Sequence, residues 1–168
     1  EGALLVVAGS GGVHTEEVRR QWPRVAELPF DSDRKRMTTV HRLPDSADLG
    51  DWQAALGETA SAAGASFLAV TKGAVDELLD LSTHIWREGK LLPMTPADRQ
   101  SVETANNELA ANGMRVLGIA FRLLAEPTTE HVEQELVFLG LTGMIDPPRA
   151  EVREAVARCL TAGIRPVM

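Results

Sequence analysis

The 168-residue sequence has a single cysteine, no tyrosine and few aromatic residues, which make up 4% of the chain. One thiol, Cys159, excludes an internal disulfide and a zinc site built from several cysteines. No stretch approaches the roughly 18 to 20 apolar residues of a bilayer-spanning helix, and the first residues lack the pattern of a signal peptide. We therefore expect a soluble chain that forms one globular domain, or one domain and part of a second.

The common catalytic signatures are absent as well. The sequence has no GxxxxGKS/T, GxGxxG, HExxH or GxSxG motif, so the usual nucleotide-hydrolase, dehydrogenase, zinc-protease and esterase classes find no support. The four histidines are dispersed without the spacing of metal ligands, and we expect them to be surface or hydrogen-bonded residues. A formal net charge of −7 disfavours binding of nucleic acid or of an anionic membrane surface.

Apolar periodicity and turn residues predict an alternation of helices and strands. One helix is expected to end near residue 8. Four more helices are expected over residues 15–22, 75–86, 95–112 and 146–163. Strands are expected over residues 37–43, 67–72, 115–124 and 136–141, with another strand starting at Ile164. Residues 45–64, which are rich in Ala, Gly, Asp and Ser, are expected to form a loop or a loosely packed helix.

One short segment combines an aromatic ring with concentrated positive charge. Phe30 lies four residues before the consecutive cations at positions 34–36. An exposed ring can stack on a base for roughly 1 to 3 kcal/mol, and nearby cations can bind phosphate oxygens. The alternative is that Phe30 is a core residue and that the cations are a solvated face, partly neutralised by Asp31 and Asp33.

Two further cations stand at predicted strand ends. Lys72 ends a strand directly before Gly73, so its ammonium group can project from the sheet edge while the glycine lets a ligand approach the backbone. Arg115 opens a strand, and its guanidinium group could hold a phosphate or a ribose. Both positions also have an ordinary structural interpretation. A lysine at the end of a strand commonly protects a sheet edge from pairing with another chain, and an arginine at the start of a strand is ordinary.

In order along the chain, five segments resemble motifs of the P-type cation-transporting ATPases, and together they cover nearly the whole sequence. The segments are EGALLVVA, LPFDSDRKRMTTVHR, VTKGAVDELL, GMRVLGIAFR and FLGLTGMIDPPRAEVREAVARCLTAGIRPVM. The third is similar to the family's KGAPE motif. The RKRM and DPPR motifs resemble those of the calcium or sodium/potassium-type branch more than those of the heavy-metal branch.

The resemblance implies roles for the residues singled out above. Phe30 would stack on adenine, and Lys35 and Lys72 would line the pocket near the base and the phosphates. Gly73 would be kept beside Lys72 as part of the same motif. Arg115 would contact the phosphate or ribose side of the nucleotide.

Other positions match the family near the two ends of the chain or depart from its pattern. Glu1 would supply the acidic residue of the adenosine pocket, and Arg149 would help the phosphorylation domain to grip the nucleotide. Val75 and Asp76 replace the proline and glutamate of KGAPE, so we expect the pocket to survive with an altered helix start. Asp146 belongs to the DPPR motif and is not the phosphorylated aspartate, whose DKTGT motif is expected upstream.

The fold implied by both lines of reasoning is α/β, with a mainly antiparallel sheet flanked by helices. Residues 1–138 would form a nucleotide-binding domain, and residues 139–168 a strand and helix of the phosphorylation domain. The resemblance implies a cytoplasmic domain that presents ATP, with Mg²⁺ in the intact pump, to the phosphorylation domain. The partners would be that domain and the actuator domain, with membrane contact only through transmembrane segments elsewhere in the pump.

Two other functions are considered. A non-enzymatic regulatory or docking module would keep the sheet and bind a protein through the basic stretch at positions 34–36. A complete small phosphatase would require its own nucleophile strand with a DxD or DKTG-like motif, and no strand of this kind is predicted. We expect the chain to bind ATP weakly and to show no steady ATPase activity by itself.

Overall fold

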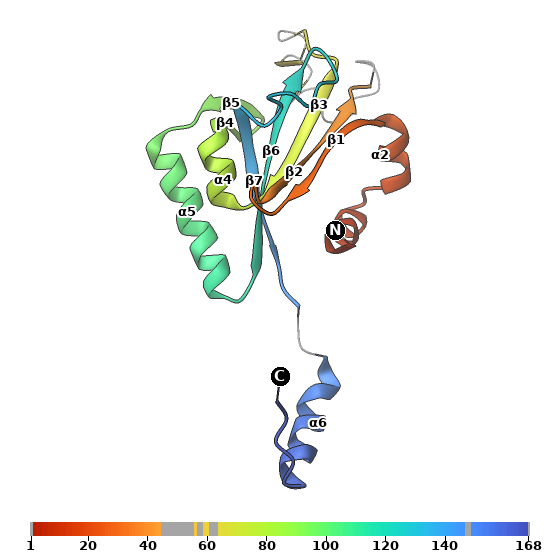
Figure 1. The fold of residues 1–168 in the computed structure, drawn as a ribbon, viewed down its shortest axis with the longest axis vertical. Coiled ribbons are helices and arrows are strands. Elements are labelled where there is room, and N and C mark those ends of the chain that lie inside the picture. Colours follow the sequence, from red (N-terminus) through yellow and green to blue (C-terminus); the bar gives the residue numbers. More distant parts are fainter. Residues whose placement is uncertain (1, 45–55, 57–58, 61–63, 147–148, 168) are drawn as a thin grey trace.

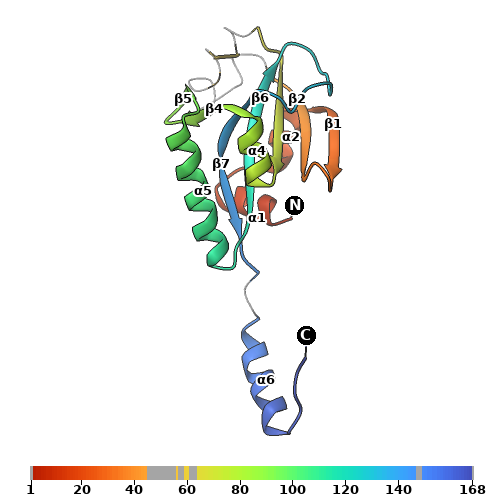
Figure 2. The same ribbon diagram turned by 60° about the vertical axis from the view of Figure 1, so that its left-hand side comes forward.

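A single seven-stranded sheet dominates the computed structural model, which describes residues 2–44, 56, 59–60, 64–146 and 149–167. The strand order is β1-β2-β3-β6-β7-β4-β5, and every neighbouring pair is antiparallel except the parallel pair β4 and β7. Helices α4 and α5 lie on one side of this sheet, and α1 and α2 lie on the other (Figures 1 and 2). The predicted α/β fold with a mainly antiparallel sheet is confirmed.

The elements have the following bounds. The strands are β1 (Arg24–Asp31), β2 (Arg36–Arg42), β3 (Phe67–Gly73), β4 (Ser82–Arg87), β5 (Lys90–Pro93), β6 (Arg115–Leu124) and β7 (Leu136–Met144). The helices are α1 (Gly2–Ser10), α2 (Thr15–Gln21), α4 (Val75–Leu81), α5 (Pro96–Ala111) and α6 (Ala150–Thr161).

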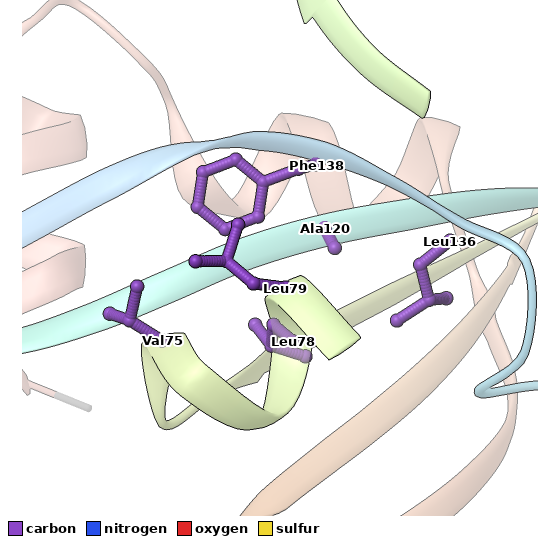
Figure 3. Packing of buried hydrophobic residues seen from close by; sticks show 6 residues of the cluster. All are labelled: Val75, Leu78, Leu79, Ala120, Leu136 and Phe138. Atoms are coloured by element: carbon purple, nitrogen blue, oxygen red, sulfur yellow. The ribbon is translucent and has the colours of Figure 1, made fainter. Parts of the chain in front are cut away.

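The main core lies between α4 and the centre of the sheet. Val75, Leu78 and Leu79 of α4 point towards Ala120 of β6 and Phe138 of β7 (Figure 3). Leu78 and Leu79 are completely buried, and each such side chain stabilises the fold by about 1.5 to 3 kcal/mol. This packing fixes the segment that directly follows β3.

The residue pattern of β3 separates the two faces of the sheet. Phe67, Ala69 and Thr71 are buried on the face that α4 covers, whereas Leu68, Val70 and Lys72 alternate with them and are half-buried. On the face opposite α4, the end of the sheet near Leu68 is covered by a small cluster. Its members are Leu56, Phe121 and Val137, with Leu68, Trp86 and Leu123 packed against them. The Lys72 end of this face lies outside that cluster.

One predicted helix is wrong in its second half. The spacing of apolar residues predicts a helix over residues 75–86, but α4 ends at Leu81 and the chain continues as β4. The Ser82 hydroxyl donates to the Leu78 carbonyl at 2.7 Å and closes the helix. Ile85 then pairs with Phe138 of β7 and Trp86 packs edge-on against Phe121, so pairing with the sheet overrides the helical spacing.

Other differences concern strands. The sequence patterns missed β1 and β5, the two edge strands of the sheet. The strand expected at Ile164 is wrong, because residues 164–167 form no strand and pair with none of the strands that the structure describes. Most of the segment 45–64 lies outside the described residues, so its prediction as loop or helix is not addressed.

The other predicted helices and strands are present, although some bounds differ: the helix expected over residues 146–163 is α6 (Ala150–Thr161). α5 begins after Thr95, whose side chain accepts from the Asp98 backbone N–H while the Asp98 carboxylate accepts from the Thr95 backbone N–H, a reciprocal cap. β7 runs as one strand past residue 138 to Met144 and pairs with β6 from Val137 to Met144, with one register shift. Helix α6 stands apart from the sheet in both views (Figures 1 and 2).

Candidate functional site

Strand pairing places two of the predicted site residues on one face of the sheet. Lys72 of β3 is paired with Met37 of β2 on one side and with Ile119 of β6 on the other. Arg115 stands four residues before Ile119 on the same strand, so alternation puts it on the same face. Four residues of strand span about 13 Å. The face opposite α4 therefore carries a lysine and an arginine at the same end of the sheet.

Phe30 lies near the tip of the β1–β2 hairpin, one residue before the paired residues Asp31 and Arg36. Its side chain is 65% exposed, which contradicts the alternative that it is a core residue. Strand β1 is two positions from β3 in the sheet, a separation of about 10 Å. An exposed aromatic ring thus stands at the same end of the sheet as Lys72.

The hairpin loop that follows Phe30 is closed by its own backbone. The Asp31 carboxylate accepts hydrogen bonds from the backbone N–H groups of Asp33 at 2.8 Å and Arg34 at 3.0 Å. The bond from Arg34, followed by that from Asp33, lowers the pKa of Asp31 below its ordinary value. Lys35 has a φ of 52° and its N–H donates to the Asp31 carbonyl at 2.7 Å, which completes the turn.

The three consecutive cations have different partners. The ammonium group of Lys35 lies 3.1 Å from the Glu77 carboxylate, and this hydrogen bond, with the charge of Glu77, raises the pKa of Lys35. Arg34 and Arg36 bind Glu133, at 2.7 Å and 2.8 Å, and Arg36 also lies 3.7 Å from the Glu77 carboxylate. The Lys35 side chain is 53% exposed and that of Arg36 only 14%. Lys35 is thus the most accessible of the three. Glu77 and Glu133 form the ion pairs with this group, and the charges of Arg34 and Arg36 also contribute to the lowered pKa of Asp31.

Gly73 is surrounded by the chain itself. A Cβ atom at this position would lie 2.5 Å from the Arg36 Cβ atom and 2.6 Å from the Lys35 carbonyl oxygen. The Ala74 N–H also donates to that Lys35 carbonyl at 3.0 Å. The glycine therefore lets the β1–β2 hairpin lie directly against the end of β3.

Glu133 is the functional candidate that the sequence patterns missed. It belongs to the connection between β6 and β7, and the residue is only 7% exposed. Burial raises the pKa of Glu133, but hydrogen bonds from Arg34, Thr38 and Arg36 outweigh burial and leave the pKa below its ordinary value. The only local sign that this segment is buried is Val132, the single apolar side chain in the polar stretch 128–135.

The structure does not bring every predicted site residue together. Glu1 lies outside the described residues. Arg149 is exposed and precedes the first residue of α6, which stands away from the sheet (Figure 1). Within the part of the chain that the structure describes, Phe30, Lys35, Lys72 and Arg115 therefore lie at one end of the sheet. Lys72 and Arg115 are on the face opposite α4, whereas the Lys35 ammonium group binds Glu77 of α4.

Residues 1–151 match the family model described as P-type ATPase, cytoplasmic domain N. This chain belongs to that family. Calcium-transporting ATPase 1 of Bacillus cereus is 37% identical over 168 residues, which cover 99% of the N-domain chain and 17% of the relative. The calcium-transporting ATPase of Bacillus subtilis is 34% identical and covers 100% of the chain, again with 17% of its own length.

A sodium-transporting relative is also similar to this N-domain chain. P-type sodium-transporting ATPase4 of Toxoplasma gondii is 35% identical and covers 100% of the chain, with 15% of its own length. These matches support the calcium or sodium/potassium-like branch that the motifs indicate. The N-domain chain spans about one sixth of the length of the curated relatives that it matches. None of the helices that the structure describes combines the length and apolar character needed to cross a bilayer.

Proposed function

We propose that this chain binds ATP and presents it to the aspartate that becomes phosphorylated in a P-type cation-transporting ATPase. The observation that carries this proposal is the exposed Phe30 ring at the end of the sheet where Lys35, Lys72 and Arg115 also lie. An aromatic ring can stack on adenine, and two ammonium groups and a guanidinium group can bind phosphate oxygens. The chain is acidic overall, with a formal net charge of −7. Positive charge gathered at this one place therefore favours an anionic small ligand over a large anionic partner.

In the whole pump, the chain would act together with other domains. ATP bound here, accompanied by Mg²⁺, would reach the aspartate when the phosphorylation and actuator domains move, and the transmembrane segments would carry the cation. Arg149 would act from the phosphorylation side, and Glu1 from the adenosine side. The domain boundary at residue 138 stays a prediction, and β7 continues in the sheet to Met144. The chain and the two domains with which it acts would lie on the cytoplasmic side of the membrane.

Binding to the isolated chain should be weak. One stacking contact and two or three exposed charge contacts give about 4 to 5.5 kcal/mol net, which corresponds to dissociation constants of roughly 0.1 to 1 mM. Weak binding is sufficient when a tethered partner domain acts at high effective concentration. Turnover would require the aspartate of the phosphorylation domain, so the chain should bind ATP without hydrolysing it.

An amide-shift NMR titration with ATP, first without and then with Mg²⁺, tests the proposal, with AMP as a comparison. We expect shifts centred on Phe30, Lys35, Lys72 and Arg115. Phe30→Ala should lower ATP affinity at least about fivefold, since stacking on an aromatic ring contributes about 1 to 3 kcal/mol. Its melting temperature should hardly change, because the ring is 65% exposed. Val25→Ala, on the same strand and also exposed, is the matched control.

Unchanged ATP affinity in Phe30→Ala would refute the site. If the parent chain also showed no shifts at the four positions, the docking-module alternative would replace the nucleotide site. That alternative relies on the basic stretch, and two of its three cations already bind Glu133.

A further inference from the structure

Glu133 is the centre of a buried polar cluster on the face that α4 covers. One guanidinium nitrogen of Arg34 donates to both Glu133 carboxylate oxygens, at 2.7 Å and 2.8 Å. The Nε atom of Arg36 donates to the same carboxylate at 2.8 Å. The Thr38 hydroxyl donates to it at 2.8 Å and is itself 2.8 Å from the Thr71 hydroxyl. The carboxylate therefore connects β2, β3 and the hairpin loop.

The segment that carries Glu133 is itself held in place. Val132, its neighbour, is 1% exposed and packs in a core cluster with residues of β2, β3 and β6. Arg122 of β6 donates to the His131 carbonyl at 2.6 Å and to the Glu135 carboxylate at 3.0 Å. Because contacts on both sides fix this segment, Glu133 is an anchor that does not depend on the hairpin for its position.

Arg34 links this anchor to the residue before Phe30. Its second guanidinium nitrogen donates to the Pro29 carbonyl at 2.6 Å. Arg36 donates to the Arg34 carbonyl at 3.0 Å, so the loop between them is tied to the same carboxylate. The chain of contacts thus runs from Glu133 through Arg34 to the peptide bond that joins Pro29 to Phe30.

The hairpin needs such a link because β1 is an edge strand. In the described part of the sheet it pairs only with β2, and its register is irregular between Leu28 and Asp31. Phe30 lies within that irregular stretch. Regular strand hydrogen bonds therefore do not fix its backbone, and the contact of Arg34 with Pro29 supplies a constraint from outside the strand.

We propose that Glu133 is a positioning residue for nucleotide binding, which holds the Phe30 ring in its stacking orientation through Arg34. This inference rests on the proposed function, since it assigns a further residue to the same site. Glu133 would not touch the nucleotide. It would lower the free-energy cost of ordering the Phe30 ring when the adenine base binds. The effect would therefore concern binding of the base and not binding of the phosphates.

The test compares Glu133→Gln with Glu135→Gln in the 168-residue chain. Both variants remove one negative charge from the same segment, but Glu135 bonds only to Arg122 among the described contacts and not to the hairpin. Affinities are measured by NMR titration with ATP and with inorganic tripolyphosphate. We expect Glu133→Gln to weaken ATP binding by about three- to tenfold, the range expected for ordering one side chain on binding. Tripolyphosphate binding should match that of Glu135→Gln.

A double-mutant cycle separates positioning of Phe30 from general loosening of the fold. In a Phe30→Ala background, Glu133→Gln should have no further effect on ATP affinity, because the ring on which it acts is absent. An equal loss in both backgrounds would overturn the proposal, as would stronger ATP binding in Glu133→Gln. Equal loss of ATP and tripolyphosphate affinity would also overturn it, since that result indicates general damage to the site.

Arg34→Lys provides the measurement if Glu133→Gln does not fold. Lysine keeps the positive charge near Glu133 but lacks the second nitrogen that reaches Pro29, so ATP binding should weaken and tripolyphosphate binding should not. Unchanged ATP affinity in Arg34→Lys would refute the link. The Phe30→Ala variant distinguishes failure of the proposed function from failure of this inference. If the proposed function is wrong, Phe30→Ala leaves ATP affinity unchanged. If only this inference is wrong, Phe30→Ala still weakens ATP binding.

Discussion

Substitution of Gly73 by alanine tests whether this glycine serves the fold of the site. The added Cβ atom would lie 2.5 Å from the Arg36 Cβ atom, 2.6 Å from the Lys35 carbonyl oxygen and 2.8 Å from the Arg36 Cα atom. None of these atoms is the end of a flexible side chain. The hairpin must therefore move away from β3, and the hydrogen bond from Ala74 N–H to the Lys35 carbonyl, 3.0 Å long, is lost or stretched.

The expected cost follows from these contacts. Overpacking against rigid atoms costs about 1 to 3 kcal/mol, and a lost backbone hydrogen bond adds about 1 kcal/mol. A total near 3 kcal/mol lowers the melting temperature of a chain of this size by roughly 6 to 12 °C. ATP affinity should fall too, because Phe30 and Lys35 both lie on the displaced hairpin.

Gly140→Ala is the matched control for this experiment. Gly140 also lies in the sheet, on β7, but a Cβ atom there would have no neighbour within 4 Å. The effect of glycine on the unfolded chain is similar at both positions, so the difference between the variants reports the close contact. Thermal unfolding and ATP titration of both variants provide the measurement. If Gly73→Ala melted within about 1 °C of Gly140→Ala, the argument from close packing would be refuted.

Two further predictions concern charged groups. Glu77→Gln should strengthen ATP binding about two- to fivefold at low salt, since it releases Lys35 from an exposed ion pair; Asp80→Asn on the same helix is the control, and equal effects of the two would contradict this explanation. Hydrogen bonds from Thr95 lower the pKa of Asp98 to about 2. Because the folded pKa is depressed, the stability that Asp98 supplies is present above about pH 4 and is lost as pH falls towards 2. Urea unfolding should show a flatter pH dependence for Asp98→Asn in that window, and an unchanged slope would show that the cap does not contribute.

The regular elements that local patterns predicted are those whose sequences contain their own start and stop signals. The helix α5 has a cap, a proline in its first turn and an acidic residue at the position that completes the cap. The long apolar strands β6 and β7 have strand length and clear boundaries. Edge strands such as β1 and β5 lack such patterns, because only one neighbour and few buried residues constrain their sequences.

The second half of the predicted helix over residues 75–86 failed for a different reason. Ile85 and Trp86 stand at helical spacing from Leu78, but they are also good strand residues with an available parallel partner in β7. A local pattern cannot decide between two structures that bury the same side chains. The pairing of distant strands decides, and it is visible only in the folded chain.

The sequence by itself determined the family, the α/β class and the residues that could bind a nucleotide, because motif spacing and residue type are local properties. The tertiary structure decided which of these residues meet. It placed Lys72 and Arg115 on one face, turned Phe30 outward and paired Arg34 and Arg36 with Glu133, a residue 97 to 99 positions away in the chain. A buried charge must find a partner wherever the fold supplies one, and no local pattern contains that information.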